Sequence, residues 1–256
     1  MSAVAAVLRK ELTVYFGTPL FYFLGFFFLL VEGYLFYFFY LPSFYLISLQ
    51  VAQNPSFAGS VGPLAMVLRS FFEDLGFIFL LLTPIVTMRL LAEEKRSGTA
   101  ELLFTYPLPD WAVIGGKFLA ALTVWVCFLG LTAVYPLIFA AVTRVDPGQV
   151  VSGYLGLLLL GAACLALGLF ASSLTENQII AAISAFALLL LFWLLGATQE
   201  MSSTWARVLT TLSLREHLPN LARGVIDTRD LLYYACFIYF FLFLTKRQLE
   251  SRRWRA

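Results

Sequence analysis

Residues 151–196 read VSGYLGLLLLGAACLALGLFASSLTENQIIAAISAFALLLLFWLLG, and this stretch decides the fold. It holds two apolar runs, 151–172 and 179–196, separated only by the short polar segment 173–178. A membrane-spanning helix needs about 20 mostly apolar residues, and each run comes close to that length. A tight polar turn between two such runs predicts a helical hairpin, not one long helix. The segment therefore predicts two neighbouring spans of a membrane protein.

The composition of the whole chain also indicates that most of it lies in a lipid bilayer. Of the 256 residues, 61% are hydrophobic and 12% are charged, whereas a soluble domain carries roughly 25% charged residues. So few charges cannot cover a water-facing surface, and the lipid bilayer is the expected partner of most of the chain. The net charge of +2 is too small to argue for nucleic acid, and no basic cluster is interleaved with stacking aromatic residues.

Four further apolar segments bring the predicted number of spans to six. They are 20–40, 75–91 with an amphipathic outer extension back to about residue 64, 113–142 and 231–245. The partly polar connection 198–230 predicts an outer pair of short re-entrant helices. We therefore expect an all-α, polytopic membrane protein in which residues 1–256 form one domain.

Prolines and small residues inside these spans predict local features of the helices. Pro84 and Pro136 each remove one backbone hydrogen bond and are expected to kink spans two and three. Glycines of span four and alanines of span five allow close approach, which predicts packing within the hairpin of these two spans.

The distribution of basic residues predicts the orientation of the chain. With the N-terminus inside, eleven of the seventeen Lys and Arg residues fall on the cytosolic side. These eleven are Arg9, Lys10, Arg89, Lys95, Arg96, Lys117, Lys246, Arg247, Arg252, Arg253 and Arg255. We therefore expect a multi-pass protein of the cell inner membrane with both termini in the cytosol.

The first 17 residues form a separate amphipathic segment. Val4, Leu8, Leu12 and Tyr15 recur at helical spacing, with basic residues beside them. This pattern predicts a helix that lies along the cytosolic membrane surface, and the following Gly17-Thr18-Pro19 predicts a break before span one. The alternative is that the segment is simply the solvated start of that span.

Residues 92–111, AEEKRSGTAELLFTYPLPDW, form the predicted cytosolic loop between spans two and three. The second span should continue into Glu93, Glu94, Lys95 and Arg96 and end at Gly98, a residue suited to the left-handed C′ position. Thr99 is then placed to cap a new short helix, with Glu101 complementing its positive end. Pro107 should end that helix about two turns later.

This short helix would carry Leu102, Leu103, Phe104 and Tyr106 at the cytosolic face. An apolar helix in that position must lie on the membrane, on its own subunit or in a groove of another protein. The run of charges at 93–96 favours docking to a soluble partner. An ordinary interfacial loop is the alternative interpretation.

The stretch AEEKRSGTAELLFTYPLPDWAVIGGKFLAAL resembles the signature loop of type-2 ABC (ABC-2) exporter permeases. That loop has a Glu-rich turn, a Gly-Thr pair, a Glu-Leu-Leu run, a Tyr-Pro pair and a Gly-Lys-Phe at the start of the next span. The segments SSLTENQIIAA, RGVIDTRDLLYY and KRQLESRRW are similar to the family too. The resemblance covers nearly the whole chain and is weakest at 41–64. It is nearest to permease subunits associated with gliding motility, and the permease of nitrous-oxide-reductase maturation is more distant.

The resemblance implies a function and roles for these segments. The N-terminal helix would be an elbow helix, and 99–106 would be the coupling helix that enters a groove of a separate ATPase, with the charges at 93–96 steering that contact. The turn of Thr175, Glu176 and Asn177 would be a second cytosolic contact. Two permease chains, identical or related, would face each other above an ATPase dimer and export a substrate by alternating access.

The chain itself is not expected to be an enzyme or to hold a cofactor. Its Gly-Lys pair in GGKF, residues 115–118, lacks the GxxxxGK[ST] pattern that cradles phosphates. ATP and Mg²⁺ are therefore expected on the partner ATPase, and Lys117 is interpreted as a lysine that snorkels to the interface. The lone His217 has no second ligand nearby in the sequence, so we expect no metal site. Asp227 and Asp230 are interpreted as helix caps.

Glu32 is the one acidic residue well inside the first span. Ionisable residues at that depth usually face a cavity or a partner, so Glu32 is a candidate for the translocation path or a subunit interface. A protonated or snorkelling carboxyl is the other interpretation.

Other function classes explain the sequence less well. An intramembrane enzyme requires a catalytic set that the single histidine does not supply. A channel or ion-coupled carrier would show several buried charges or repeated halves. A membrane anchor for an ATP-driven mechanical complex would need the same cytosolic loop, and it is the main alternative.

Overall fold

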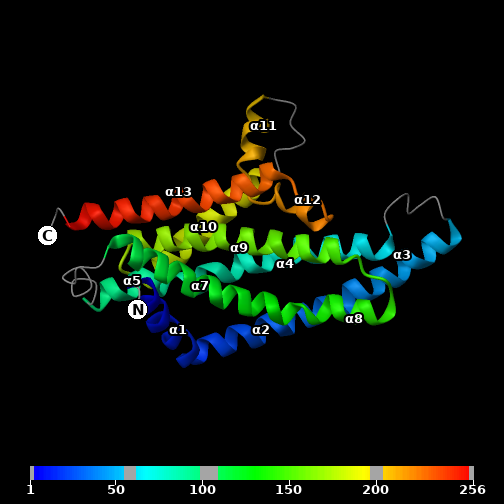
Figure 1. The fold of residues 1–256 in the computed structure, drawn as a ribbon, viewed down its shortest axis with the longest axis horizontal. Coiled ribbons are helices and arrows are strands. Elements are labelled where there is room, and N and C mark those ends of the chain that lie inside the picture. Colours follow the sequence, from blue (N-terminus) through cyan, green and yellow to red (C-terminus); the bar gives the residue numbers. More distant parts are fainter. Residues whose placement is uncertain (1–2, 55–61, 99–108, 197–203, 254–256) are drawn as a thin grey trace.

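The computed structural model describes residues 3–54, 62–98, 109–196 and 204–253, and these are almost entirely helical. The helices are α1 (Ala3–Gly17), α2 (Pro19–Leu35), the π-helix η1 (Phe36–Tyr40), α3 (Leu41–Gln53), α4 (Pro63–Thr87), α5 (Arg89–Arg96), α7 (Asp110–Thr132), α8 (Val134–Val142), α9 (Pro147–Leu174), α10 (Gln178–Leu194), α11 (Thr204–Thr211), α12 (Leu218–Ala222) and α13 (Thr228–Arg253). The long helices run side by side along one axis, and α1 begins at the end of the bundle where α13 ends (Figure 1).

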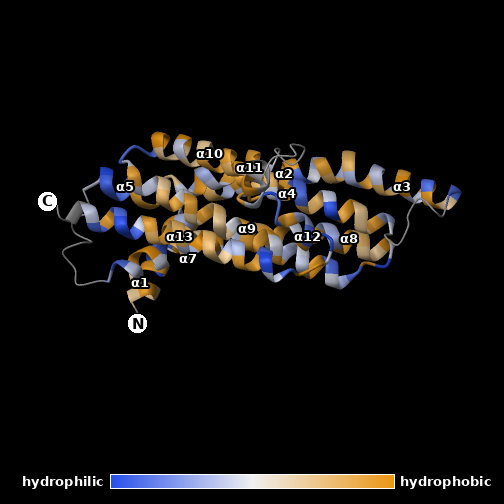
Figure 2. Ribbon diagram, turned by 90° about the horizontal axis from the view of Figure 1, so that it is seen from above, coloured by the Kyte–Doolittle hydropathy of each residue, from blue (hydrophilic) through white to orange (hydrophobic). Residues whose placement is uncertain are grey.

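Each of the six predicted apolar segments is helical. Five helical stretches are long and apolar enough to cross a membrane, namely Pro19–Gln53, Pro63–Arg96, Asp110–Val142, Pro147–Leu174 and Thr228–Ser251. The helix α10 is apolar but only 17 residues long, so the sixth span stays a prediction. Hydrophobic residues predominate along the long helices, while polar residues gather at the end that carries α5 and around α12 (Figure 2). The chain is therefore a multi-pass, all-helical membrane protein.

The first span is longer than the sequence predicted. Instead of ending at Tyr40, the helix continues through η1 and α3 to Gln53. Pro42 does not end it, and it lies in the first turn of α3, directly after the π-helical turn η1. The helix thus continues past Pro42, with a π-helical turn just before this proline.

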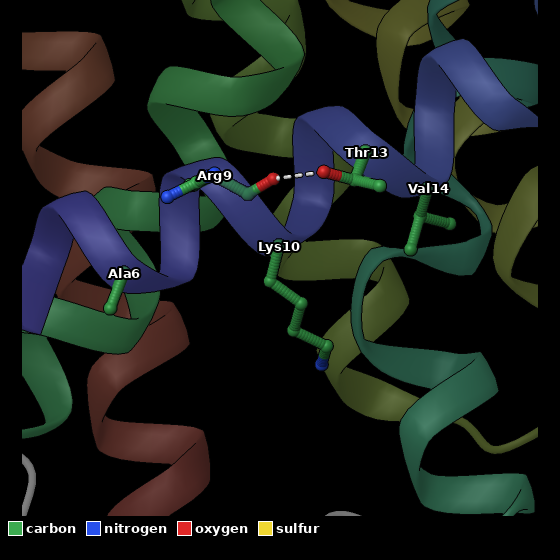
Figure 3. A pocket seen from close by; sticks show the side chains of 5 residues that line it. All are labelled: Ala6, Arg9, Lys10, Thr13 and Val14. Carbon is green, nitrogen blue, oxygen red and sulfur yellow. Dashed lines mark hydrogen bonds between the residues drawn. The ribbon is translucent and has the colours of Figure 1, made fainter.

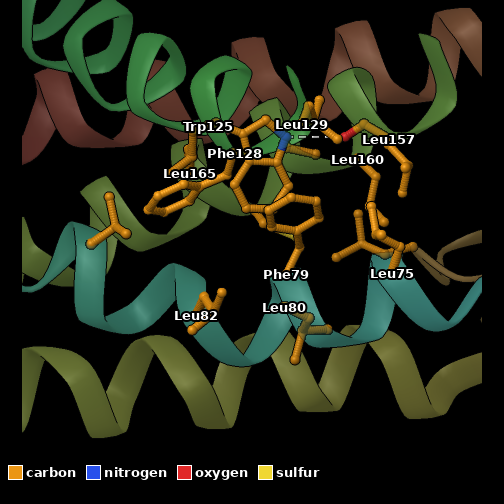
Figure 4. Packing of buried hydrophobic residues seen from close by; sticks show 14 of the residues in the cluster. Leu75, Phe79, Leu80, Leu82, Trp125, Phe128, Leu129, Leu157, Leu160 and Leu165 are labelled. Atoms are coloured by element: carbon orange, nitrogen blue, oxygen red, sulfur yellow. Dashed lines mark hydrogen bonds between the residues drawn. The ribbon is translucent and has the colours of Figure 1, made fainter. Parts of the chain in front are cut away.

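The helix α9 is the centre of the bundle. It packs against α4, α7, α10, α12 and α13, and 78% of its apolar window is buried. The aromatic and aliphatic side chains of α4 and α7 pack against it around Phe79 and Trp125 (Figure 4). This one helix therefore holds most of the others together.

The glycines of α9 accept side chains from helices other than α10. Gly153 faces the ring of Phe72 in α4, and Gly161 faces the ring of Trp125 in α7. The sequence predicted that these small residues would pack the hairpin on itself. That interpretation was too narrow, because α9 also uses them to bring α4 and α7 close.

The prolines inside spans two and three, Pro84 and Pro136, differ in their effect on the helix. Pro136 cannot donate to the carbonyl of Thr132, and the helix is interrupted three residues before Pro136, at Ala133, between α7 and α8. The kink predicted at Pro136 stays a prediction. Pro84 lies inside α4, but the interruption comes one turn later, at Met88. A serine of another helix causes this second interruption, as described below.

The connection between α10 and α13 contains two short helices, α11 and α12, as predicted. Asp227 accepts a hydrogen bond from the backbone N–H of Arg229 and acts as a cap. Asp230 has a different role from the predicted one. Its carboxylate lies 2.7 Å from His217 Nδ1 and accepts a hydrogen bond from Asn220. His217 is therefore not isolated, and it ties this connection to α13.

Adding a methyl group at Gly161 tests the central role of α9. The Cβ of Gly161→Ala would lie 1.9 Å from Trp125 Nε1, so the ring must move. We expect a loss of about 1–3 kcal/mol, seen as a lower unfolding temperature of the purified protein in detergent. Gly130→Ala in α7 is the control, because nothing lies within 4 Å of its Cβ position. Equal stability of the two variants would contradict this packing.

Candidate functional site

The predicted ATPase-coupling region begins at α5, which continues α4 beyond Met88. The helix α5 ends at Arg96 with Lys95 and Arg96 in its last turn, where basic residues complement the negative end of a helix. Gly98 follows with φ of +70°, the left-handed conformation that the sequence predicted for it. The backbone N–H of Gly98 donates to the carbonyl of Lys95 and closes the helix end. The start of the predicted loop is thus a defined helix terminus.

The other predicted residues of this loop fall in a part that the structure does not describe. They are Thr99, Glu101, Leu102, Leu103, Phe104, Tyr106 and Pro107. The coupling helix therefore stays a prediction, while both of its flanks, α5 and α7, are defined.

Four charged residues join these two flanks to α1. Lys117 Nζ in α7 lies 2.8 Å from Glu11 Oε1 in α1 and 2.9 Å from Glu94 Oε1 in α5. Lys10 Nζ lies 2.6 Å from the same oxygen of Glu94. We call these residues the Lys117 cluster. With two ammonium groups and two carboxylates, the cluster is electrically balanced.

The Lys117 side chain is 1% exposed, so the prediction that it snorkels to the interface was wrong. A buried ammonium needs close anionic partners because it has lost its water, and Glu11 and Glu94 supply them. Lys10 lies at the edge of the cluster. Burial by itself would lower the pKa of Lys10, but its hydrogen bond to Glu94 and the charges of Glu94 and Glu11 outweigh that effect and raise the pKa.

The helix α1 is fastened along one face by further contacts. Gly116 allows α1 to approach α7, because a Cβ at this position would lie 2.7 Å from Val7. The hydroxyl of Tyr15 donates to the carbonyl of Val86, and Arg89 lies 4.5 Å above the Tyr15 ring. The predicted break after α1 is present at Thr18. That α1 lies along the membrane surface stays a prediction.

The other side of α1 is open. A shallow hollow is lined by Ala6, Arg9, Lys10, Thr13 and Val14 (Figure 3). Of these residues, Lys10 reaches back to Glu94 in α5. The buried face of α1, in contrast, consists of Val7, Glu11 and Tyr15, spaced four residues apart. The helix therefore has one face committed to the bundle and one face free for lipid or another protein.

The helix α9 is joined to α5 by Ser172, whose side chain bonds to the backbone where α4 meets α5. The hydroxyl oxygen of Ser172 accepts hydrogen bonds from the backbone N–H groups of Leu91 and Ala92, both at 3.1 Å. The same hydroxyl donates to the carbonyl of Met88 at 3.0 Å. A side chain inserted into the i→i−4 ladder interrupts a helix, which explains the break between α4 and α5 at Met88. Lys95 adds a hydrogen bond to the carbonyl of Ser173.

The four charged residues predicted to steer an ATPase are not equivalent. Glu93 and Arg96 are exposed, whereas Glu94 and Lys95 are engaged by Lys117, Lys10 and the end of α9. The carboxylate of Glu94 and the ammonium of Lys95 thus hold α5 in place. Only Glu93 and Arg96 present their side chains outward.

The turn between α9 and α10 is the second predicted contact. Asn177 caps α10 by accepting a hydrogen bond from the N–H of Ile179, and Thr175 accepts one from the N–H of Asn177. Glu176 is exposed at the tip. Because α5 packs against both α9 and α10, the fold brings this turn and the start of the loop to the same end of the bundle.

Glu32, the candidate residue of the translocation path, lies apart from these segments and is buried in α2.

Sequence reasoning missed Glu11 and Ser172. Glu11 had a detectable signal, because it lies four residues from both Val7 and Tyr15 on the apolar face of the N-terminal helix, where an acidic residue needs a partner. Lys117 had the matching signal as a base inside the apolar run VIGGKFLAAL. Ser172 had none, because serines at helix ends are common and its partners are backbone groups.

Comparison with known proteins agrees with this geometry. Residues 75–213, more than half of the chain, match the sequence model of the family described as ABC-2 family transporter protein. The match begins within α4 and includes α5, the loop, α7, α9 and α10. The chain therefore belongs to the ABC-2 family of transporters and is a membrane permease component of an ABC transporter. No curated protein matches it.

Removing Lys117 tests the cluster. Lys117→Met leaves Glu11 and Glu94 buried without their main counter-charge, and we expect a loss of about 3–5 kcal/mol. Lys10→Met is the control, since the Lys10 side chain is 53% exposed and its loss should cost under about 1 kcal/mol. Unfolding temperatures of the purified variants measure both. Adding Glu11→Gln to Lys117→Met should cost less than the sum of the single changes, and strict additivity would argue against the cluster.

Ser172→Ala tests the serine in the helix ladder. Without the hydroxyl, the N–H groups of Leu91 and Ala92 lose their acceptor in a buried position, which costs about 1–3 kcal/mol. We expect faster hydrogen exchange of the segment around Met88. Ser173→Ala is a matched control, because the Ser173 hydroxyl bonds only within its own turn, to Phe170. Equal exchange in both variants would refute the role of Ser172.

Proposed function

We propose that this chain couples ATP hydrolysis by a separate ATPase subunit to export of a substrate by alternating access. Loop 92–111 docks in the ATPase, with Thr99–Tyr106 as the coupling helix. The observation that carries the proposal is the Lys117 cluster, which joins α1 and both flanks of that loop. A force applied to the loop is then transmitted to three helices at once.

The contacts at the inner end suit such transmission. The helix α5 continues α4, so movement of the loop acts directly on the second span, and Lys117 transfers it to the third. Ser172 and Lys95 extend the connection to α9 at the centre of the bundle. Because packed helices shift as rigid bodies between discrete arrangements, a small displacement of the loop can reorient several spans.

The outward side chains give the docking surface its charge. Glu93 and Arg96 steer the approach of the ATPase, and Glu176 with Thr175 and Asn177 provides a second contact beside them. ATP and Mg²⁺ are bound by that partner. The functional unit contains two permease chains, identical or related, above an ATPase dimer in the inner membrane, with both termini cytosolic.

The substrate path is formed by spans one, two and five, with Glu32 beside it. The interior is apolar and aromatic, which favours hydrophobic, lipid-like or peptide cargo over ions. Within the ABC-2 family, the resemblance supports a place near the permease subunits associated with gliding motility.

Charge substitutions in the loop test the docking site. We expect Leu103→Asp and Phe104→Asp to abolish co-purification with the ATPase and to reduce ATP hydrolysis by the complex in nanodiscs to the level of the ATPase alone. An apolar contact of this kind cannot accept a buried, unpaired carboxylate. Val225→Asp is the control, because it makes the same change at a residue that is 58% exposed in the connection between α12 and α13.

The outcomes separate the two main functions. Retained binding and hydrolysis in both loop variants would show that the loop is not the docking element. If binding is lost as expected but the wild-type complex moves no lipid or peptide across vesicle membranes, the chain is instead the anchor of an ATP-driven mechanical complex.

A further inference from the structure

The side chain of Glu32 is enclosed within the helical bundle. Its exposed fraction is 0%, and neither carboxyl oxygen has a hydrogen-bond partner among the described residues. It lies on the buried face of α2, together with Leu24, Gly25 and Phe28. A group of this kind requires an explanation, since buried polar atoms are almost always hydrogen-bonded.

Aromatic side chains separate Glu32 from water on both sides along its helix. One turn before it, the ring of Phe28 stacks on Phe79 at 5.0 Å. One turn after it, the ring of Phe36 packs against Tyr135 at 4.8 Å. The carboxyl group therefore lies between two aromatic layers formed by α2 and η1 with α4 and α8.

Among the residues that the structure describes, the charged and titratable groups that interact with Glu32 include no cation. Asp74 of α4, Tyr40 of η1, Tyr135 of α8 and Tyr154 of α9 are close enough to interact with it electrostatically. Asp74 repels a negative charge at Glu32, and the three tyrosines carry none that could balance it. An ionised carboxylate in this position would be very costly, whereas a neutral carboxylic acid costs far less.

We propose that Glu32 is a proton-binding site of this permease. The carboxyl group holds a proton while the helices are closed around it. When α2 moves away from α4 and α8, the O–H bond dissociates, the electron pair stays on the carboxylate, and the proton passes to water or to Asp74. The site makes the opening of the bundle depend on pH.

Asp74, the acceptor named above, borders an open cavity of about 230 Å³, which is also lined by Glu73, Phe77, Trp193, Arg215 and Leu218. The hydroxyl of Tyr40 donates to Asp74 at 3.0 Å, so Asp74 connects η1 with this cavity. The helix η1 begins one turn after Glu32, and the N–H of Phe36 donates to the carbonyl of Glu32. Single π-helical turns are rare and often mark functional sites.

This inference does not depend on the proposed ATPase contact, so the isolated chain suffices as the test. The folded protein binds one proton more than the unfolded chain once the pH exceeds the ordinary range of glutamate. Wild-type stability must therefore fall as the pH rises from 5 to 8. We expect the unfolding temperature to fall by up to roughly 3 °C per pH unit from this group.

Glu32→Gln keeps the shape of the neutral acid but cannot ionise. We expect it to remove this decline and to raise the unfolding temperature at pH 8 above that of the wild type. Glu73→Gln is the matched control, because Glu73 borders the same cavity but is ion-paired with Arg69 at 2.8 Å. It should keep the wild-type decline. Identical pH dependence of the wild type and Glu32→Gln would overturn the proposal.

Infrared spectroscopy of the wild type decides the question even if the variant does not fold. We expect the carbonyl stretching band of a protonated carboxylic acid at pH 7, and isotopic labelling of the glutamate carboxyl groups should shift it. If the wild type has no such band at neutral pH, Glu32 is ionised and the proposal is wrong. The same holds if a folded Glu32→Gln variant retains the band.

Discussion

The inner end of this protein depends on the need of one buried ammonium group for anionic partners. Lys117 is shielded from water by α1, so its charge is tolerable only with Glu11 on one side and Glu94 on the other. This requirement fixes three segments that are far apart in the sequence. It also explains why an amphipathic N-terminal helix is held in one orientation, with Val7 against Gly116 and Tyr15 against the end of α4.

A second constraint comes from the small side chains of α9. Glycines at 153, 161 and 168 leave room for Phe72, Trp125 and Thr87, so that α4 and α7 approach its axis closely. In lipid, helices gain little from the hydrophobic effect when they associate, and close van der Waals contact becomes more important. The hydroxyl of Ser172, near the end of α9, also bonds to the backbone of α5. The helix α9 therefore provides both the central packing of the bundle and a connection to the start of loop 92–111.

Local features of this chain were predictable from the sequence, and long-range ones were not. The left-handed Gly98 and the turn before Gln178 each follow from a few neighbouring residues. Glu11, one of the two partners of Lys117, lies 106 residues away, and the partners of Ser172 lie about 80 residues away. One sequence contains no signal for such pairs. Glu11 and Lys117 were each recognisable as charges on apolar faces, but only the fold brings them together.

The length of the first span has a consequence for the membrane itself. Its 35 residues extend over about 52 Å as a helix, whereas the hydrocarbon core of a bilayer is about 30 Å thick. The helix must therefore tilt within the lipid, or roughly 20 Å of it must project from the lipid at the end formed by α3. Exposed apolar residues continue along this helix as far as Leu49. The helix therefore has no single preferred depth in the membrane. It can span bilayers of different thickness with little hydrophobic mismatch.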